Sequence, residues 1–174
     1  MRKGRPRHLH RRLSLAGSGG LACGILAVGI APHATAAPPT ACGVNLASQQ
    51  ITEAVGSLPS YPGTDWTWSA DPRTIYGNYD PCATLSTALV TVERATGSSP
   101  ITALMFHNGS YVGTATSEAY AFTSLNEART TDDTVVLDYK DGRNVCTACP
   151  GPINTVRYQW QGDHVAMLDP APPA

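Results

Sequence analysis

After residue 36 the chain has few basic residues and no second long apolar run. Six Lys and Arg residues remain there against thirteen Asp and Glu residues, a formal net charge of −7. An acidic surface repels phosphate backbones and anionic lipid headgroups, which argues against binding to nucleic acid or directly to a membrane surface. Without a later stretch of about 20 apolar residues, no transmembrane segment is expected once residues 1–36 are removed.

The sequence also lacks the motifs of common catalytic sites. It contains no Gly-x-Ser-x-Gly for a serine nucleophile and no Gly-rich phosphate loop. Asp132-Asp133 falls between two expected strands, where Thr-Asp-Asp-Thr is typical of a turn, and His107 and His164 lie at expected strand ends beside turns. We therefore expect no catalytic residue, no metal site, no cofactor and no enzymatic activity.

What the sequence does contain is an export signal. Residues 1–36 hold half of the basic residues of the chain and none of the acidic ones, and Leu13–Ala31 is an apolar run rich in Gly, Ala, Leu and Ile. Ala34-Thr35-Ala36 then provides a cleavage site of small residues. We expect an exported protein, secreted or associated with the cell envelope. Arg11-Arg12 partly matches a twin-arginine signal, so the general secretory and twin-arginine routes both stay open.

Two cysteines, one inside the signal and one after it, could carry a lipid, and neither has the required residues before it. Cys23 follows Gly20-Leu21-Ala22, and the apolar run continues beyond it. Cys42 follows Pro39-Thr40-Ala41 and lies well past the apolar run. The sequence therefore favours cleavage after Ala36 and release without a lipid anchor, with a lipid on Cys23 as the alternative.

Four cysteines remain after the signal: Cys42, Cys82, Cys146 and Cys149. An even number in an exported chain favours disulfides, and three pairings are possible. Because Cys146 and Cys149 lie close together in a turn-rich stretch, we favour Cys146–Cys149 and Cys42–Cys82. The alternative for residues 146–149 is a thiol–disulfide oxidoreductase site, but Pro150 follows at once and blocks the helix that would activate such a thiol.

The rest of the chain divides into a linker at 37–47, a single domain at 48–170 and a Pro-rich tail at 171–174. Ser48 is expected to precede a helix over Gln49–Leu58, whose apolar residues recur at helical spacing, and Pro59 ends it. The expected strands are Thr87–Glu93, Thr102–His107, Tyr111–Thr116, Thr134–Tyr139, Thr155–Trp160 and His164–Leu168.

Short connections between these strands require antiparallel pairing. Asn108-Gly109 is the clearest hairpin turn, because both residues accept positive φ. Alternation places Val135, Leu137 and Tyr139 on one face of their strand and Val156, Tyr158 and Trp160 on one face of theirs. We expect an α+β fold: a curved antiparallel meander of five or more strands, with one N-terminal helix packed on it.

Five aromatic residues precede most of the strands, namely Tyr61, Trp66, Trp68, Tyr76 and Tyr79. Aromatic side chains can stack on sugars or anchor a protein partner. They can also cover the core of a small domain, and this chain has only two phenylalanines to fill its core. We take the five as a candidate binding surface for an unknown protein or cell-wall component.

Four segments together resemble one known family. They are Asn78–Ala83, Thr96–Pro100, Phe106–Thr114 and Val156–Trp160. In this order they are similar to the LppP/LprE lipoproteins of actinobacterial cell envelopes, over roughly residues 42–170. The resemblance implies an exported, envelope-associated domain and brings no reaction or catalytic residue with it. We therefore expect a non-enzymatic binding domain stapled by disulfides.

Overall fold

A computed structural model describes residues 41–172 of the chain. The expected export signal, its cleavage site and Cys23 lie outside these residues. Within 41–172, no helix has the length and apolar character needed to cross a membrane.

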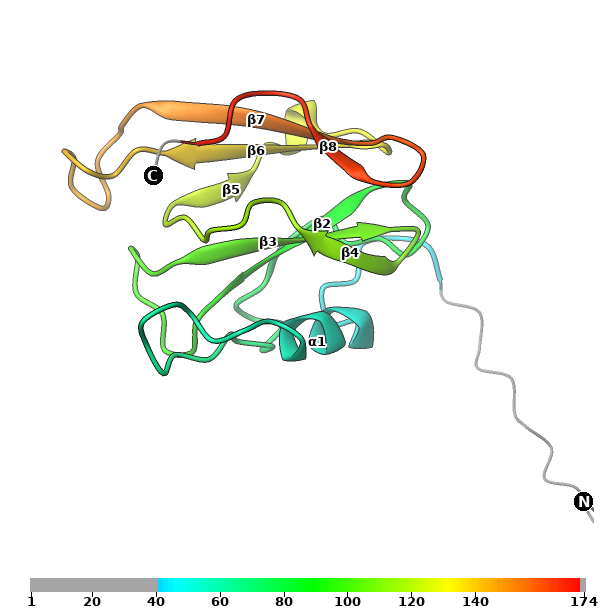
Figure 1. The fold of residues 1–174 in the computed structure, drawn as a ribbon, viewed down its shortest axis with the longest axis horizontal. Coiled ribbons are helices and arrows are strands. Elements are labelled where there is room, and N and C mark those ends of the chain that lie inside the picture. Colours follow the sequence, from blue (N-terminus) through cyan, green and yellow to red (C-terminus); the bar gives the residue numbers. More distant parts are fainter. Residues whose placement is uncertain (1–40, 173–174) are drawn as a thin grey trace, which may run out of the picture. The chain divides into compact units, whose positions relative to one another are not determined.

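The described residues form one α-helix and two four-stranded antiparallel sheets (Figure 1). The helix, α1, spans Gln49–Gly56, and a single turn of 3₁₀ helix, η1, spans Glu127–Arg129. The first sheet contains β1 (Tyr76–Gly77), β2 (Ser86–Thr91), β3 (Ile101–His107) and β4 (Ser110–Thr114). The second contains β5 (Thr123–Leu125), β6 (Thr134–Lys140), β7 (Ile153–Trp160) and β8 (Val165–Met167).

The α+β class is confirmed, but the strands belong to two sheets and not to one curved sheet. Each sheet is a meander in chain order, and residues 115–122 carry the chain from β4 in the first to β5 in the second. The division follows from burial, because β2 and β3 carry apolar residues on both faces. A single sheet covered by one helix would leave one of those faces in water.

The first sheet lies between α1 and the second sheet (Figure 1). On the helix side, Ala88, Val90, Leu104 and Phe106 pack against Ile51, Ala54 and Val55 of α1. On the other side, Leu89, Ala103 and Met105 pack against the second sheet. Successive residues of β2 and β3 therefore alternate between two cores.

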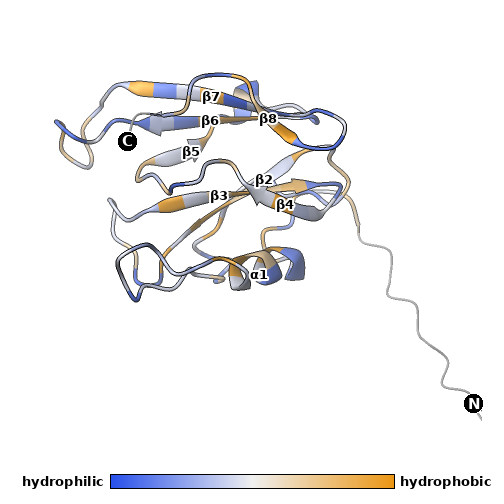
Figure 2. Cartoon of the chain, viewed as in Figure 1, coloured by the Kyte–Doolittle hydropathy of each residue, from blue (hydrophilic) through white to orange (hydrophobic). Residues whose placement is uncertain are grey.

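The second sheet packs one face of its strands against the first sheet. Val135, Leu137, Tyr139, Val156 and Tyr158 are buried between the sheets, with Trp160 partly buried beside them. This confirms the faces predicted from alternation in β6 and β7. The opposite face of β7 carries the exposed Arg157, and the strand shows both apolar and hydrophilic residues along its length (Figure 2).

Helix α1 ends at Gly56, two residues before the predicted end at Leu58. The Ser57 N–H is shared between the carbonyls of Glu53 and Ala54, which tightens the last turn, and Leu58 packs against the helix-side core. Ser48 precedes the helix, but its hydroxyl donates to the side-chain oxygen of Gln50 and not to a helix-terminal backbone group.

The predicted hairpin at Asn108-Gly109 is confirmed between β3 and β4. Both residues have positive φ, 46° and 77°. Gly109 also passes close to Pro81, whose Cα would lie 3.1 Å from a Cβ at this position. A glycine here therefore permits both the turn and the close approach of the loop before β2.

Two disulfides join cysteines of the described residues, Cys42–Cys82 and Cys146–Cys149. The first joins the segment before α1 to the turn before β2. The second closes the tip of the connection between β6 and β7. The first disulfide therefore lies beside the first sheet, and the second lies at the end of two strands of the second sheet.

Candidate functional site

Three of the five expected aromatic residues gather in the loop after α1: Tyr61, Trp66 and Trp68, here called the aromatic cluster. The rings of Tyr61 and Trp66 stack with centroids 5.9 Å apart and an interplanar angle of 17°. Trp68 meets Tyr61 edge-on, with centroids 6.2 Å apart at 80°. Trp66 has 46% of its surface exposed, so this stack presents an aromatic face to solvent.

The aromatic cluster is held by the rest of the fold. The Trp68 indole N–H donates to the Pro59 carbonyl at 2.8 Å, and its backbone forms an isolated β-bridge with Val92. Trp68 also packs against the core between α1 and the first sheet. The Thr64 hydroxyl donates to the Tyr61 carbonyl and accepts the Trp66 N–H, which fixes the turn between the stacked rings.

A groove of about 360 Å³ adjoins the aromatic cluster. Tyr61, Trp68 and four neighbouring residues form one side of this aromatic groove. The other side comes from β3, β4 and the segment that follows β4, and its polar residues are Thr102, Thr114, Thr116, Ser117 and Glu118. The groove thus combines flat apolar rings with hydroxyls and one carboxylate.

The other two expected aromatics lie elsewhere. Tyr79 is only 1% exposed, packs edge-on against Phe106 at 4.7 Å, and donates its hydroxyl to the Gly109 carbonyl. Its ring therefore belongs to the core and not to the exposed surface expected for the five aromatic residues. Tyr76 is 68% exposed on β1 and borders a separate pocket. The five residues do not form one surface.

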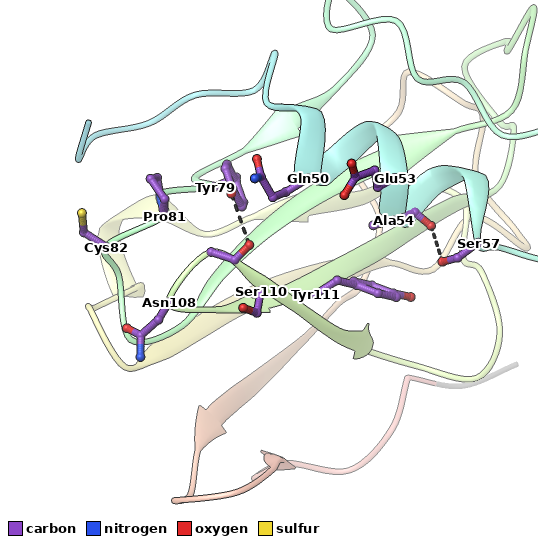
Figure 3. A pocket seen from close by; sticks show the side chains of 11 residues that line it. Gln50, Glu53, Ala54, Ser57, Tyr79, Pro81, Cys82, Asn108, Ser110 and Tyr111 are labelled. Carbon is purple, nitrogen blue, oxygen red and sulfur yellow. Dashed lines mark hydrogen bonds between the residues drawn. The ribbon is translucent and has the colours of Figure 1, made fainter. Parts of the chain in front are cut away.

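A second pocket, of about 530 Å³, lies between α1 and the β3–β4 hairpin (Figure 3). The helix contributes Gln50 and Glu53, Ser57 follows its last residue, and the hairpin contributes Asn108, Ser110 and Tyr111. Partial burial raises the pKa of the Tyr111 hydroxyl, which keeps it neutral. This pocket was not predicted from the sequence. The sequence held one indication of it: Asn78–Ala83 and Phe106–Thr114, two of the four segments that carry the family resemblance, both supply residues that line this pocket.

The Cys-x-x-Cys segment forms a closed turn in the β6–β7 connection. Cys146 and Cys149 are bonded to each other, and no helix begins at Cys146. The Lys140 ammonium donates to the carbonyls of Thr147 and Cys149 at 2.7 and 3.1 Å, and it lies over the Phe122 ring. These contacts hold the tip by its backbone and do not create the setting of an activated thiol.

The two strand-end histidines have separate structural contacts. His107 stacks on Trp160 with ring centroids 3.8 Å apart, and its Nδ1 hydrogen-bonds the Thr84 carbonyl. His164 pairs with the neighbouring Asp163 at 2.6 Å, on an exposed turn. Within the described residues, no group of three or more His, Cys, Asp and Glu side chains is placed to hold a metal ion.

Comparison with known proteins gives one family and several relatives. A family model described as LppP/LprE lipoprotein matches residues 77–163. A lipoprotein LprE of Mycobacterium leprae is 33% identical over 144 residues, covering 79% of this chain and 67% of that protein. Proteins of the same name from Mycobacterium bovis and Mycobacterium tuberculosis are 34% identical over 127 residues, covering 73% of this chain and 58% of theirs. No solved structure matches significantly.

The family match covers the candidate sites unequally. It begins at residue 77, so the aromatic cluster lies before it. The hairpin side of the second pocket and most residues around Tyr76 lie within it. The chain spans about two thirds of the Mycobacterium leprae protein and less of the other two.

Proposed function

Because this chain belongs to the LppP/LprE lipoprotein family, whose members are exported cell-envelope proteins, we propose that it is a non-enzymatic binding domain. The residues that could carry chemistry already have structural contacts. Cys146 and Cys149 are bonded to each other in a turn, and His107 stacks on Trp160. The names of the matched family and relatives state no reaction.

The aromatic groove is the proposed binding surface. Tyr61 and Trp68 line this groove, and Trp66 lies beside it, stacked on Tyr61. The observation that carries this proposal is the exposed face of Trp66, which extends the aromatic surface of the groove toward solvent. An aromatic ring that is already fixed loses little conformational freedom when a ligand covers it. The loop is therefore suited to binding without a large rearrangement.

The proposed ligand is an uncharged glycan segment of the cell wall. Flat aromatic faces stack on sugar rings, and the hydroxyls and the Glu118 carboxylate along the groove can hydrogen-bond sugar hydroxyls. The net charge of −7 after residue 36 opposes polyanionic polymers. A protein partner anchored by Trp66 is the alternative that the experiment must separate.

Co-sedimentation with purified, protein-free cell wall tests this proposal. Trp66→Ala should weaken binding at least about tenfold, since it removes the exposed aromatic face. The matched control is Tyr76→Ala, which deletes an even more exposed aromatic at a different place and should leave cell-wall binding unchanged. Trp68→Ala is less informative because Trp68 also packs on the core.

Urea unfolding of each variant shows whether the domain is intact. Equal cell-wall binding by Trp66→Ala and the wild-type protein would exclude the exposed aromatic face from the site and would contradict this proposal. The protein partner would be favoured by a different result. In that case the wild-type protein would not bind protein-free wall but would bind wall that still carries its proteins, and Trp66→Ala would abolish this binding.

A further inference from the structure

A cavity of about 750 Å³ lies where the edge strands of the two sheets approach each other. The edges are β1 of the first sheet and β5 of the second, and both line the cavity. We call this cavity the edge groove. Leu89, Ile101 and Leu125 supply buried or half-buried apolar surface within it, and the exposed Tyr76 borders it.

One side of the edge groove is an unpaired strand edge. Two hydrogen bonds to β6 flank β5: the Lys140 N–H donates to the Phe122 carbonyl, and the Asn126 N–H donates to the Val136 carbonyl. In an antiparallel pair every second residue forms such hydrogen bonds, so Ser124, midway between Phe122 and Asn126, also directs its backbone groups toward β6. The residues between them, Thr123 and Leu125, direct their N–H and C=O groups away from β6. No backbone hydrogen bond occupies these groups within residues 41–172.

The other side of the edge groove, formed by β1, also has backbone groups that face away from its neighbouring strand, over a shorter length. The Asn78 N–H donates to the Thr87 carbonyl at 3.0 Å, which makes the next pair, Gly77 with Ala88, a non-hydrogen-bonded pair. The backbone groups of Gly77 therefore also face outward. Gly77 has no side chain to cover them, and a Cβ there would lie 2.3 Å from the Thr87 oxygen.

We propose that the edge groove binds an extended peptide segment of a partner protein, which adds as a strand along the outer edge of β5. Unpaired edges accept extended peptides through main-chain hydrogen bonds, and an adjoining pocket selects side chains. The pocket here takes an aliphatic side chain over Leu89, Ile101 and Leu125. This site is separate from the aromatic groove and does not depend on the function proposed for it.

Charge favours a partner peptide over a second copy of this chain. Each copy carries a net charge of −7 after residue 36, which opposes joining two copies along one edge. A neutral or basic segment meets no such repulsion from the net charge of the domain. The lining of the groove itself carries one charge of each sign, on Arg73 and Glu127. The proposed partner segment is therefore extended, aliphatic at alternate positions and not acidic.

The test selects ligands from a displayed library of random ten-residue peptides and then examines the backbone of the best one. N-methylation of alternate amides should abolish binding to the wild-type protein, whereas methylation of the intervening amides should leave it unchanged. This pattern reports strand pairing without any change in the protein.

A pair of protein variants gives an independent readout. Leu125→Pro removes the outward N–H and leaves the hydrogen bonds of β5 to β6 in place, and Leu125→Ala removes only the side chain. We expect Leu125→Pro to bind about tenfold more weakly than Leu125→Ala, the effect of one lost hydrogen bond. Urea unfolding of the two variants checks that both are folded.

Three results would overturn the proposal. One is that no library peptide binds above a scrambled control. Another is that every N-methylated peptide binds alike, which would mean side-chain recognition alone. The third is that the wild-type protein dimerises and Leu125→Pro makes it monomeric, which would assign the edge to a second copy.

Discussion

The two sheets differ in how many of their faces are covered. The first is buried on both faces, between α1 and the second sheet. The second sheet packs only one face against another sheet, and its outer face buries Val136 but exposes charged residues such as Arg157. The first sheet is therefore the structural centre of the domain. Both proposed binding sites border it: the aromatic groove at β3 and β4, and the edge groove at β1.

The largest expected loss of stability comes from removing a large side chain from the core between α1 and the first sheet, to which the second sheet does not contribute. Phe106 is buried under α1, edge-on to Tyr79 and near Tyr111. Phe106→Ala should lower the free energy of unfolding by about 3–5 kcal/mol in urea titrations followed by circular dichroism. Val112→Ala, on the exposed side of β4, is the control and should change it by about 0.5 kcal/mol or less. A loss below about 1 kcal/mol for Phe106→Ala would contradict the central role of this sheet.

The two disulfides extend the same comparison, and the difference in stability expected between them is smaller, about 2 kcal/mol. Cys42–Cys82 spans 40 residues and Cys146–Cys149 spans 3, so the chain-entropy relation predicts stabilisation of about 4 and about 2 kcal/mol. Replacing Cys42 and Cys82 together by Ala should therefore destabilise the domain about twice as much as replacing the other pair. Urea unfolding without reductant measures both, and equal losses would show that loop length does not decide the difference.

The second sheet gives the smallest expected effect, at the hydroxyl pair of Tyr139 and Tyr158, 2.8 Å apart in the core between the sheets. Tyr139→Phe leaves the Tyr158 hydroxyl without this partner and should cost about 1–3 kcal/mol of unfolding free energy. Replacing both tyrosines by Phe should cost less than the single change. A double variant less stable than Tyr139→Phe would contradict the pairing.

The pair also predicts an alkaline dependence of stability. Burial, and then the hydrogen bond to Tyr158, raises the pKa of Tyr139 above its usual value of 10.0. The neutral folded form is therefore favoured below about pH 10, and this stability is lost as the pH rises above the unfolded pKa. Urea titrations between pH 7 and 11 should show a steeper decline for the wild-type protein than for the double Phe variant.

Long periodic segments of the fold were predictable from the sequence, and short ones were not. The faces of β6 and β7 follow from alternation, and the β3–β4 turn follows from Asn108-Gly109. β1 and β5 were missed because two and three residues are too short to show a period. Local patterns also reveal which residues are buried but not which partner covers them, so the division into two sheets was not visible.

The candidate sites were predictable only where their residues are neighbours in the chain. Tyr61, Trp66 and Trp68 lie in one loop and come together. Tyr79 comes from the same aromatic-rich stretch, but its hydroxyl reaches the carbonyl of Gly109, 30 residues further on. The pocket in Figure 3 and the edge groove likewise depend on contacts between distant segments, which composition and spacing do not encode.

The Cys42–Cys82 bond also has a mechanical consequence. It closes a covalent loop that contains α1 and the aromatic cluster, and it ends just before β2 in the first sheet. Tension applied to the domain at its N-terminal side therefore passes from Cys42 to Cys82 and on into β2. The helix and the aromatic cluster stay inside the closed loop and carry none of this load while the bond is intact.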